Sequence, residues 1–296
     1  MKRALVAEDF TAVEGLRLPA AIVARRGERF AAREGSVYIM RSPARSAARY
    51  DLAPGVVALA PGLAWLPATH TLIAADAHLA YEDVIGGAMP LWSTTEIAAL
   101  LSLVVAQLGA REIVFLGDIV HGSMMSEGAM RTVREALDLL RASATVTLVA
   151  GNHEGRSRAF AVLGATVEAC ERDGWLLVHG DRPARLGTRT IIGHLHPSLH
   201  LGGGATVPAF VASEMLVCVP ALTPYSSGLD VLGDDFARAI GGWAVTRRDA
   251  HVVAIAGERV FPFGGLATLR TTLGRSAVAS ARQPSRFRKK HLRSDR

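Results

Sequence analysis

Short apolar runs bounded by Gly, Pro or Asn recur along the chain from Val56 onward. Runs of this length between turn residues are typical of β-strands. Two stretches of helical length interrupt them, one from Ser93 or Thr94 to Gly109 and one over residues 130–143. Alternating strands and helices indicate an α/β domain. The strands of this part are predicted at residues 56–60, 63–67, 71–76, 112–118, 145–154, 175–181 and 189–196.

Farther along the chain, apolar runs follow one another with few stretches of helical spacing between them. This pattern favours consecutive, more antiparallel strands, predicted at residues 207–213, 215–222, 244–248, 251–257 and 258–263. Residues 1–52 show no sustained period, and we interpret them as a poorly defined N-terminal extension. Residues 53–275 are predicted to form one domain, and residues 276–296 a basic tail outside it.

Positive charge is concentrated at the C-terminal end of the sequence. The 296 residues carry a formal net charge of +6. Seven of the 33 Lys and Arg residues, but only one of the 27 Asp and Glu residues, lie between Arg282 and Arg296, so the rest of the chain is neutral. This tail, which includes Phe287, has the composition of a segment that follows a phosphate backbone. It is equally typical of a solvated extension.

The composition also limits where the protein functions. Half of the residues are hydrophobic, which excludes a chain that is disordered throughout. The longest apolar segment, which begins at Ile97, is too short to cross a bilayer, and the first ten residues lack the apolar region of a secretory signal. Cys170 and Cys218 lie far apart and form no CxxC pattern. We therefore expect a cytoplasmic protein without a membrane span or a disulfide framework.

Five of the predicted strands end in Asp, Asn or His. In open α/β sheets, ligands bind in the crevice outside the carboxyl ends of the strands, so these side chains are expected to converge. The five motifs are Asp76-Ala-His78, Gly117-Asp118-Ile-Val-His121, Gly151-Asn152-His153-Glu154, His179-Gly180-Asp181 and Gly193-His194-Leu-His196.

The residue types of these motifs point to metal binding. Residues two apart in an extended segment share a face, so His194 and His196 lie side by side. Two protonated imidazoles would repel each other there, whereas a metal would satisfy both. Carboxylate, imidazole and amide ligands without thiolate suit Mn, Fe(II) or Zn. Each motif alone has a structural alternative, such as a helix cap for Asp118 or a core position for His179, but the ordered set favours a pair of ions.

The order of the five motifs, over about Leu63 to Asp230, resembles the calcineurin-like metallophosphoesterases. The resemblance implies a four-layer α/β fold, in which two mixed β-sheets pack face to face between outer helices. It also implies a phosphoester hydrolase that uses two divalent ions, with Mn expected and Fe or Zn as alternatives. Under this resemblance Asp76, His78 and His196 hold the first ion, Asp118 bridges the two, and Asn152, His179 and His194 hold the second.

The resemblance assigns a catalytic role to His153, which follows a proposed ligand but is not expected to bind metal. As a general acid it would stabilise the transition state or protonate the leaving oxygen. His121 stands where many members of the family have a second Asp, and we treat it as a pocket residue that contacts substrate. Arg156 and Arg158 are candidate phosphate-binding residues because a guanidinium forms forked contacts with phosphate. A solvated loop is the alternative for both arginines.

Three longer segments, two of which include a metal motif, are similar to the bacterial and archaeal group that includes DNA-ligase-associated, DNA-damage-response phosphoesterases. They are residues 63–83, 193–201 and 218–231. This similarity implies a Mn-dependent phosphodiesterase that acts on nucleic acid or nucleotides, with a role in DNA repair. Two alternatives remain, a phosphomonoesterase or nucleotide phosphatase and, more distantly, a non-catalytic scaffold on the same fold. The sequence does not indicate the oligomeric state.

Overall fold

The structure, a computed structural model, describes residues 49–85, 91–121, 125–152, 163–183, 187–202 and 205–281. Its first sheet has six strands in the order β1-β2-β3-β4-β5-β6. The pairs from β1 to β4 are antiparallel, and β4, β5 and β6 run parallel. Their bounds are β1 Arg49–Ala53, β2 Val56–Leu59, β3 Leu63–Leu66, β4 Thr71–Ala75, β5 Glu112–Leu116 and β6 Thr145–Val149.

The second sheet has nine strands, with the path β13-β10-β11-β12-β9-β8-β7 and with β14 and β15 continuing from β11. Parallel pairs join β8 to β9 and β9 to β12, while β11, β14 and β15 form an antiparallel series. The strands are β7 Ala169–Arg172, β8 Trp175–Val178, β9 Thr190–Ile192, β10 Pro197–Gly202, β11 Ala205–Ala212, β12 Leu216–Cys218, β13 Leu229–Asp230, β14 His251–Ala256 and β15 Arg259–Gly265.

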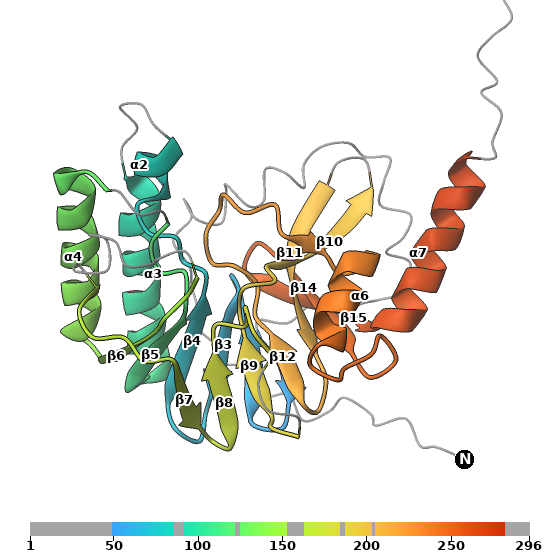
Figure 1. The fold of residues 1–296 in the computed structure, drawn as a ribbon, viewed down its shortest axis with the longest axis horizontal. Helices are drawn as coiled ribbons and strands as arrows, with labels where there is room; N and C mark the ends of the chain where they lie inside the picture. The colour runs from blue at the N-terminus through green and yellow to red at the C-terminus, as the bar shows by residue number, and fades with distance from the viewer. Residues whose placement is uncertain are drawn as a thin grey trace, which may run out of the picture.

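Helices cover the outer faces of the two sheets (Figure 1). On the side of β5 and β6 lie α2 Tyr81–Ile85, α3 Trp92–Leu108 and α4 Glu127–Arg141. Next to the second sheet lie α6 Asp234–Gly241 and α7 Leu266–Ala281. The predicted four-layer arrangement of two mixed sheets between helices is therefore confirmed. Among the described residues, no helix is both long and apolar enough to span a membrane.

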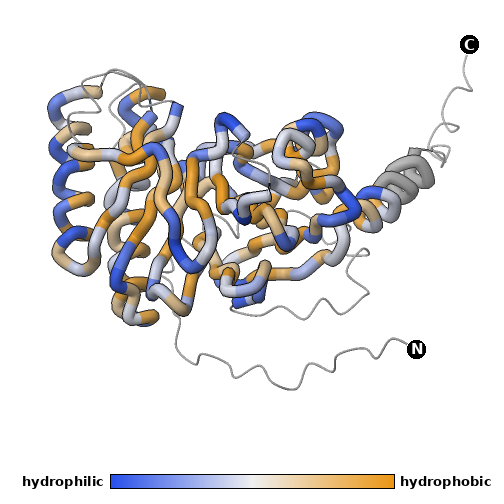
Figure 2. Tube along the Cα trace, turned by 60° about the horizontal axis from the view of Figure 1, so that its bottom comes forward, coloured by the Kyte–Doolittle hydropathy of each residue, from blue (hydrophilic) through white to orange (hydrophobic). Residues whose placement is uncertain are grey.

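The alternation of side chains along the strands divides the core into two apolar clusters. Ile191 belongs to the cluster between the sheets, whereas Ile192 belongs to the cluster under α6 and α7. In β14, Val253 and Val252 are divided in the same way, as expected when successive side chains point to opposite faces. Figure 2 shows this distribution as mainly hydrophobic strands and a helix α4 with alternating hydrophobic and hydrophilic positions. The second sheet is thus buried on both faces.

Helix α3 differs from the predicted start although it ends as expected. It begins at Trp92, and no side chain caps its first turn. The hydroxyls of Ser93 and Thr94 face inward instead: Ser93 donates to Glu82, and Thr94 accepts from the N–H of Ala80. The predicted cap at Ser93 or Thr94 is wrong because these hydroxyls hold the segment before the helix. Gly109 ends the helix in a left-handed conformation, as predicted.

Two other regions refine the predicted organisation. Residues 244–248, predicted as a strand, form turns because the carboxylate of Asp249 accepts from both the N–H and the hydroxyl of Thr246. The predicted domain limits at residues 52 and 276 fall inside β1 and α7, respectively. Most of the N-terminal extension and the basic tail from residue 282 lie outside the described residues.

Candidate metal centre

The registers of the parallel strands bring the predicted motifs to one edge. Ala75 of β4 pairs with Leu116 of β5, and Leu116 pairs with Val149 of β6, so the residues that follow these strands lie side by side. In the second sheet Val178 pairs with Ile192, which aligns the ends of β8 and β9. A bridge between Ala75 and Ala221 joins the two sheets at this edge.

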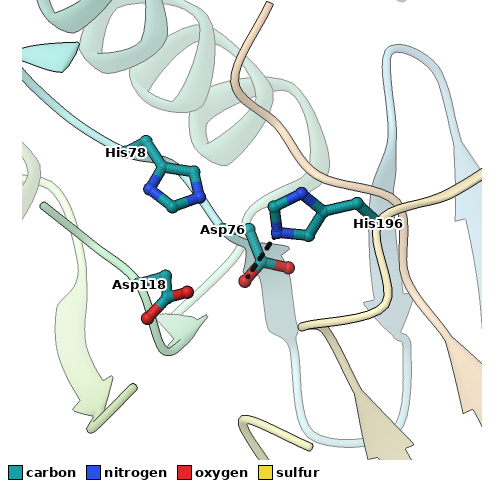
Figure 3. A group of neighbouring side chains, drawn as sticks. All are labelled: Asp76, His78, Asp118 and His196. Atoms are coloured by element: carbon teal, nitrogen blue, oxygen red, sulfur yellow. Dashed lines mark ion pairs between the residues drawn. The ribbon is translucent and has the colours of Figure 1, made fainter. Parts of the chain in front are cut away.

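One group of donors combines residues from both sheets. Its four side chains point toward one another, and each contributes one donor atom within 4.8 Å of the others (Figure 3). Nε2 of His196 lies 3.4 Å from Oδ1 of Asp76. The group consists of Asp76, His78, Asp118 and His196. Its donor types are those expected for a divalent cation.

Oδ1 of Asp76 is the atom that most clearly indicates cation binding. The atom is buried, and no described residue forms a hydrogen bond with it. Ring nitrogens of His179 and His196 approach to 3.6 and 3.4 Å, which is beyond hydrogen-bond length. The other carboxylate oxygen accepts the N–H of His194 at 2.8 Å. A buried carboxylate oxygen without a hydrogen-bond donor is costly, and a cation would satisfy it.

A second group of donors meets at Nε2 of His179. Nδ1 of this ring faces the carbonyl of Leu116 at 3.1 Å, and a carbonyl only accepts, so Nδ1 carries the proton. Nε2 therefore presents a lone pair. Oδ1 of Asn152 lies 2.8 Å from it, Nδ1 of His194 3.1 Å and Oδ2 of Asp118 3.5 Å. Two accepting oxygens, those of Asn152 and Asp118, thus face this lone pair, and a ring nitrogen of His194 lies beside them. This arrangement fits a cation held by Asp118, His179 and His194.

The backbone conformations at the site are unusual. Five of the site residues adopt positive φ angles between 42° and 57°, a region that non-glycine residues rarely occupy. Each such conformation costs on the order of 1–3 kcal/mol and persists only where the surroundings determine it. These residues are Asp76, His78, Asp118, His194 and His196. The fold therefore maintains strained backbone where the predicted ligands lie.

Gly151 allows two of the strand ends to approach each other. A side chain at this position would collide with both the backbone N and the carboxylate of Asp118. The glycine before Asn152 is therefore required for close packing against another proposed ligand. This explains physically why the motif after β6 begins with glycine.

The surroundings of His194 and His196 shift the pKa values of the two rings in opposite directions. Burial, reinforced by the nearby His179, lowers the pKa of His194 below its usual value. Burial also acts to lower the pKa of His196, but the carboxylates of Asp76 and Asp118 outweigh it and the pKa is raised. His194 is thus favoured as a neutral donor at neutral pH. His196 requires the loss of a more firmly held proton before it can bind a cation.

The remaining predicted site residues are distributed as follows. Nδ1 of His121 lies 3.0 Å from Nδ1 of His78, at the border of the first donor group. Three residues lie outside the described residues, namely His153, Arg156 and Arg158. The structure therefore brings together all seven predicted metal ligands and His121. The roles of the three others stay predictions.

Several neighbours of the site were not among the predicted site residues. Tyr81 and Tyr225 stack with ring centroids 5.3 Å apart, and Tyr81 also contacts His121 edge-on at 4.8 Å. Glu82 is buried and accepts hydrogen bonds from Ser93 and Tyr225. Burial acts to raise the pKa of Glu82, but these hydrogen bonds outweigh it and the pKa is lowered. Tyr81, Glu82 and Tyr225 lie in segments 63–83 and 218–231 but in none of the five motifs, so their contacts with the site appear only in the tertiary structure.

Known proteins resemble this chain at the level of family and fold. The family model of the calcineurin-like phosphoesterases matches residues 69–203. A crystal structure of the nuclease MPE from Pseudomonas putida has a TM-score of 0.54 and 23% sequence identity, covering 70% of this chain and 94% of that one. This identity establishes likeness of fold alone. A search of curated proteins finds no match.

The fold and the donor groups define the class of the protein as a metallophosphoesterase, a hydrolase of phosphoester bonds. Residues 69–203, somewhat less than half of the chain, match the model of the calcineurin-like phosphoesterase family. The family resemblance and the enzyme class expected from the sequence are thereby confirmed. The narrower similarity to the DNA-ligase-associated group is not confirmed by these matches.

Proposed function

We propose that this protein is a dinuclear, Mn-dependent phosphodiesterase that acts on nucleic acid or nucleotides. The observation that carries the proposal is the presence of two donor groups that share Asp118. A shared carboxylate suits two ions about 3.5–4 Å apart, the usual spacing in two-metal hydrolases. Bound divalent cations supply a nucleophile near neutral pH and neutralise phosphate charge.

In this proposal each ion has its own ligand set. Asp76, His78 and His196 would hold the first ion, and Asn152, His179 and His194 would hold the second. Asp118 belongs to both donor groups and would contribute to both sites. The hydrogen-bond requirement of Asp76 Oδ1 supports the first set, and the lone pairs around Nε2 of His179 support the second. Oxygen and nitrogen ligands without thiolate are compatible with Mn, and Fe or Zn remain alternatives.

The substrate-facing roles rest on the sequence motifs. His153 protonates the leaving oxygen as general acid. Arg156 and Arg158 bind the phosphate through their guanidinium groups. His121 contacts the substrate beside the first ion, which its position next to His78 supports. The ring of Tyr81 also contacts that of His121 edge-on and limits its orientation.

Nucleic acid is the proposed substrate class for two reasons. The structural neighbour from Pseudomonas putida is a nuclease, which makes polynucleotides the first substrates to examine. The basic residues 282–296 would add phosphate contacts that depend on salt concentration. A cytoplasmic location and a role in DNA repair are part of the same proposal and rest on the sequence alone.

A comparison of two chromogenic esters tests the function. The metal-stripped protein is reloaded with Mn²⁺ and its hydrolysis of bis-p-nitrophenyl phosphate is compared with that of p-nitrophenyl phosphate. We expect a higher kcat/KM for the diester, followed by cleavage of single-stranded or duplex DNA. The variant Asp118→Asn serves as the inactive control, and His200→Ala, an exposed histidine outside the donor groups, as the active one.

The other outcomes each have a definite meaning. Preference for the monoester would replace the proposal by a phosphomonoesterase or nucleotide phosphatase. Failure of the Mn-loaded protein to cleave either ester or any DNA or RNA oligonucleotide would support a non-catalytic scaffold. Deleting residues 282–296 tests the tail separately, because equal salt dependence of DNA binding with and without it would remove the tail from the proposal.

A further inference from the structure

Residues 223–228, the last part of the connection between β12 and β13, run directly against the first donor group. Leu222, the residue before the segment, donates its N–H to the carbonyl of Ala75 at 2.8 Å. Thr223, the first residue of the segment, donates its N–H to the carbonyl of Asp76 at 3.3 Å. Both acceptors lie at the end of β4. The segment is therefore attached to the strand that presents the buried carboxylate of Asp76.

Tyr225 attaches the same segment to the helical layer. Its hydroxyl donates to Oε1 of Glu82 at 2.9 Å. Glu82 is itself fixed, because the N–H and the hydroxyl of Ser93 donate to its two oxygens at 2.8 and 2.7 Å. The ring of Tyr225 stacks on Tyr81 with an interplanar angle of 28°. These contacts leave little freedom to the residue that follows Tyr225.

Gly228 fixes the other end of the segment against His196. Its φ angle is 70°, and a side chain there would meet Cβ of Ser198 at 2.8 Å and collide with the carbonyl of His196. Only glycine fits so close to this backbone. The next residue, Leu229, donates its N–H to the same carbonyl at 3.0 Å. The segment is thus held on both sides of Ser226.

Ser226 itself lies at the ring of His196. Its Oγ is 2.6 Å from Nδ1, while Nε2 of the same ring faces Asp76. A histidine that binds a cation through Nε2 keeps its proton on Nδ1, and a partner usually accepts that proton. A hydroxyl has two acceptor lone pairs. Gly228 N–H uses one at 3.2 Å, and the other is directed to His196.

We propose that Ser226 is a positioning residue of the first cation site, where its hydroxyl accepts the Nδ1 proton of His196 and holds Nε2 toward the ion. This inference rests on the proposed function, since it requires a cation at that position. A hydroxyl is also able to donate, so Ser226 keeps the same contact when Nε2 of the metal-free ring carries the proton. The ring therefore needs no reorientation when the ion binds.

The test is a Mn²⁺ titration of metal-stripped protein, with free Mn²⁺ followed by electron paramagnetic resonance. Wild type is expected to bind two ions. Ser226→Ala should bind one ion as wild type does and the other roughly 10–100-fold more weakly, the usual cost of losing a partner behind a metal-binding histidine. Ser226→Thr keeps the hydroxyl and should recover most of the affinity. Ser227→Ala, at the adjacent exposed residue, is the matched control and should bind as wild type.

Wild-type affinity of Ser226→Ala for both ions would overturn the inference, and so would an equal loss in Ser226→Ala and Ser226→Thr. The unaffected second ion shows that the variant is folded. Because no substrate is present, the result is independent of turnover. Wild type that binds Mn²⁺ but hydrolyses nothing would refute the proposed function and leave the role of Ser226 intact.

Discussion

Two buried polar clusters lie at opposite ends of β5 and differ in how their polar atoms are satisfied. At its first residue, Glu112 accepts two hydrogen bonds from Arg172 at 2.6 and 2.7 Å, together with the hydroxyls of Thr71 and Thr147. Just beyond its last residue, the donor groups around Asp118 face one another without enough protons between them. Both clusters join the two sheets, because Arg172 belongs to β7 of the second sheet.

The cluster around Glu112 is suited to stabilise the fold, whereas the one around Asp118 is suited to bind cations. The carboxylate of Glu112 is 12% exposed and fully bonded, and its backbone lies in a regular strand. The donor groups have strained backbone and a buried carboxylate oxygen to which no described residue donates. A satisfied polar cluster stabilises the fold, whereas one that lacks a cation costs free energy until the cation binds. Substitutions at the two ends should therefore affect different quantities.

The largest effect is expected for His153→Ala. Loss of the proposed general acid should lower kcat by roughly 10²–10⁴-fold. The Mn²⁺ content should stay at the wild-type value, because His153 is not a proposed ligand. Steady-state kinetics on the diester and metal analysis measure the two quantities. His70→Ala, at the start of β4 and outside the donor groups, serves as control, and unchanged turnover of His153→Ala would refute the acid role.

At the other end of β5, Glu112→Gln should reduce stability and spare catalysis. Replacing the charged partner of Arg172 weakens charge-assisted hydrogen bonds, which are worth roughly 1.5–3 kcal/mol. The free energy of unfolding, measured with urea on metal-free protein, should fall by about that amount. Glu171→Gln, an exposed neighbour in β7, should change it by less than about 0.5 kcal/mol. A large loss of kcat per folded molecule would show that Glu112 also affects catalysis and would contradict the assignment of stability to one end of β5 and catalysis to the other.

A smaller change, a factor of two in bound metal, is expected for His196→Ala. The variant should hold one Mn²⁺ per chain where wild type holds two, because only the first ion loses a ligand. Metal analysis after dialysis counts the ions. His200→Ala removes an exposed histidine of β10 and should retain both. Full occupancy in His196→Ala would remove this residue from the ligand set.

The smallest expected effect concerns pH. Burial acts to raise the pKa of Glu112, but Arg172 and the threonine hydroxyls outweigh it, so the pKa is lower in the folded protein than in the unfolded chain. The resulting stability is fully present above the unfolded pKa of about 4.3 and is lost as pH falls through the lower folded pKa. The difference in unfolding free energy between wild type and Glu112→Gln should therefore be constant from pH 7 to about 5.5 and shrink below about 4. A difference independent of pH would contradict this origin.

The sequence predicted which side chains meet in the donor groups better than it predicted the residues that support them. The end of β5 was predictable because an apolar run followed by Gly117 and Asp118 has a clear pattern. The position of Ser226 was not, since residues 223–228 have no period and their course depends on contacts with Ala75, Glu82 and His196.

The same contrast applies to the fold. The continuous apolar runs of β14 and β5 defined strands because each run reflects burial directly. The start of α3 was missed because Ser93 and Thr94 have the composition of a cap but hydrogen-bond to Glu82 and Ala80 instead. Propensity describes what a hydroxyl does near its own backbone, and here distant residues compete for it.

The division of the donor groups between the two sheets has a consequence for folding. Asp76, His78 and Asp118 follow strands of the first sheet, whereas His179, His194 and His196 follow strands of the second. Neither half of the chain contains a complete set, so tight binding begins only after the sheets have docked. A cation bound there would cross-link them and stabilise the assembled molecule by about 2.7 kcal/mol at a hundredfold excess over its Kd. Removal of the cation should therefore lower the free energy of unfolding by about that amount.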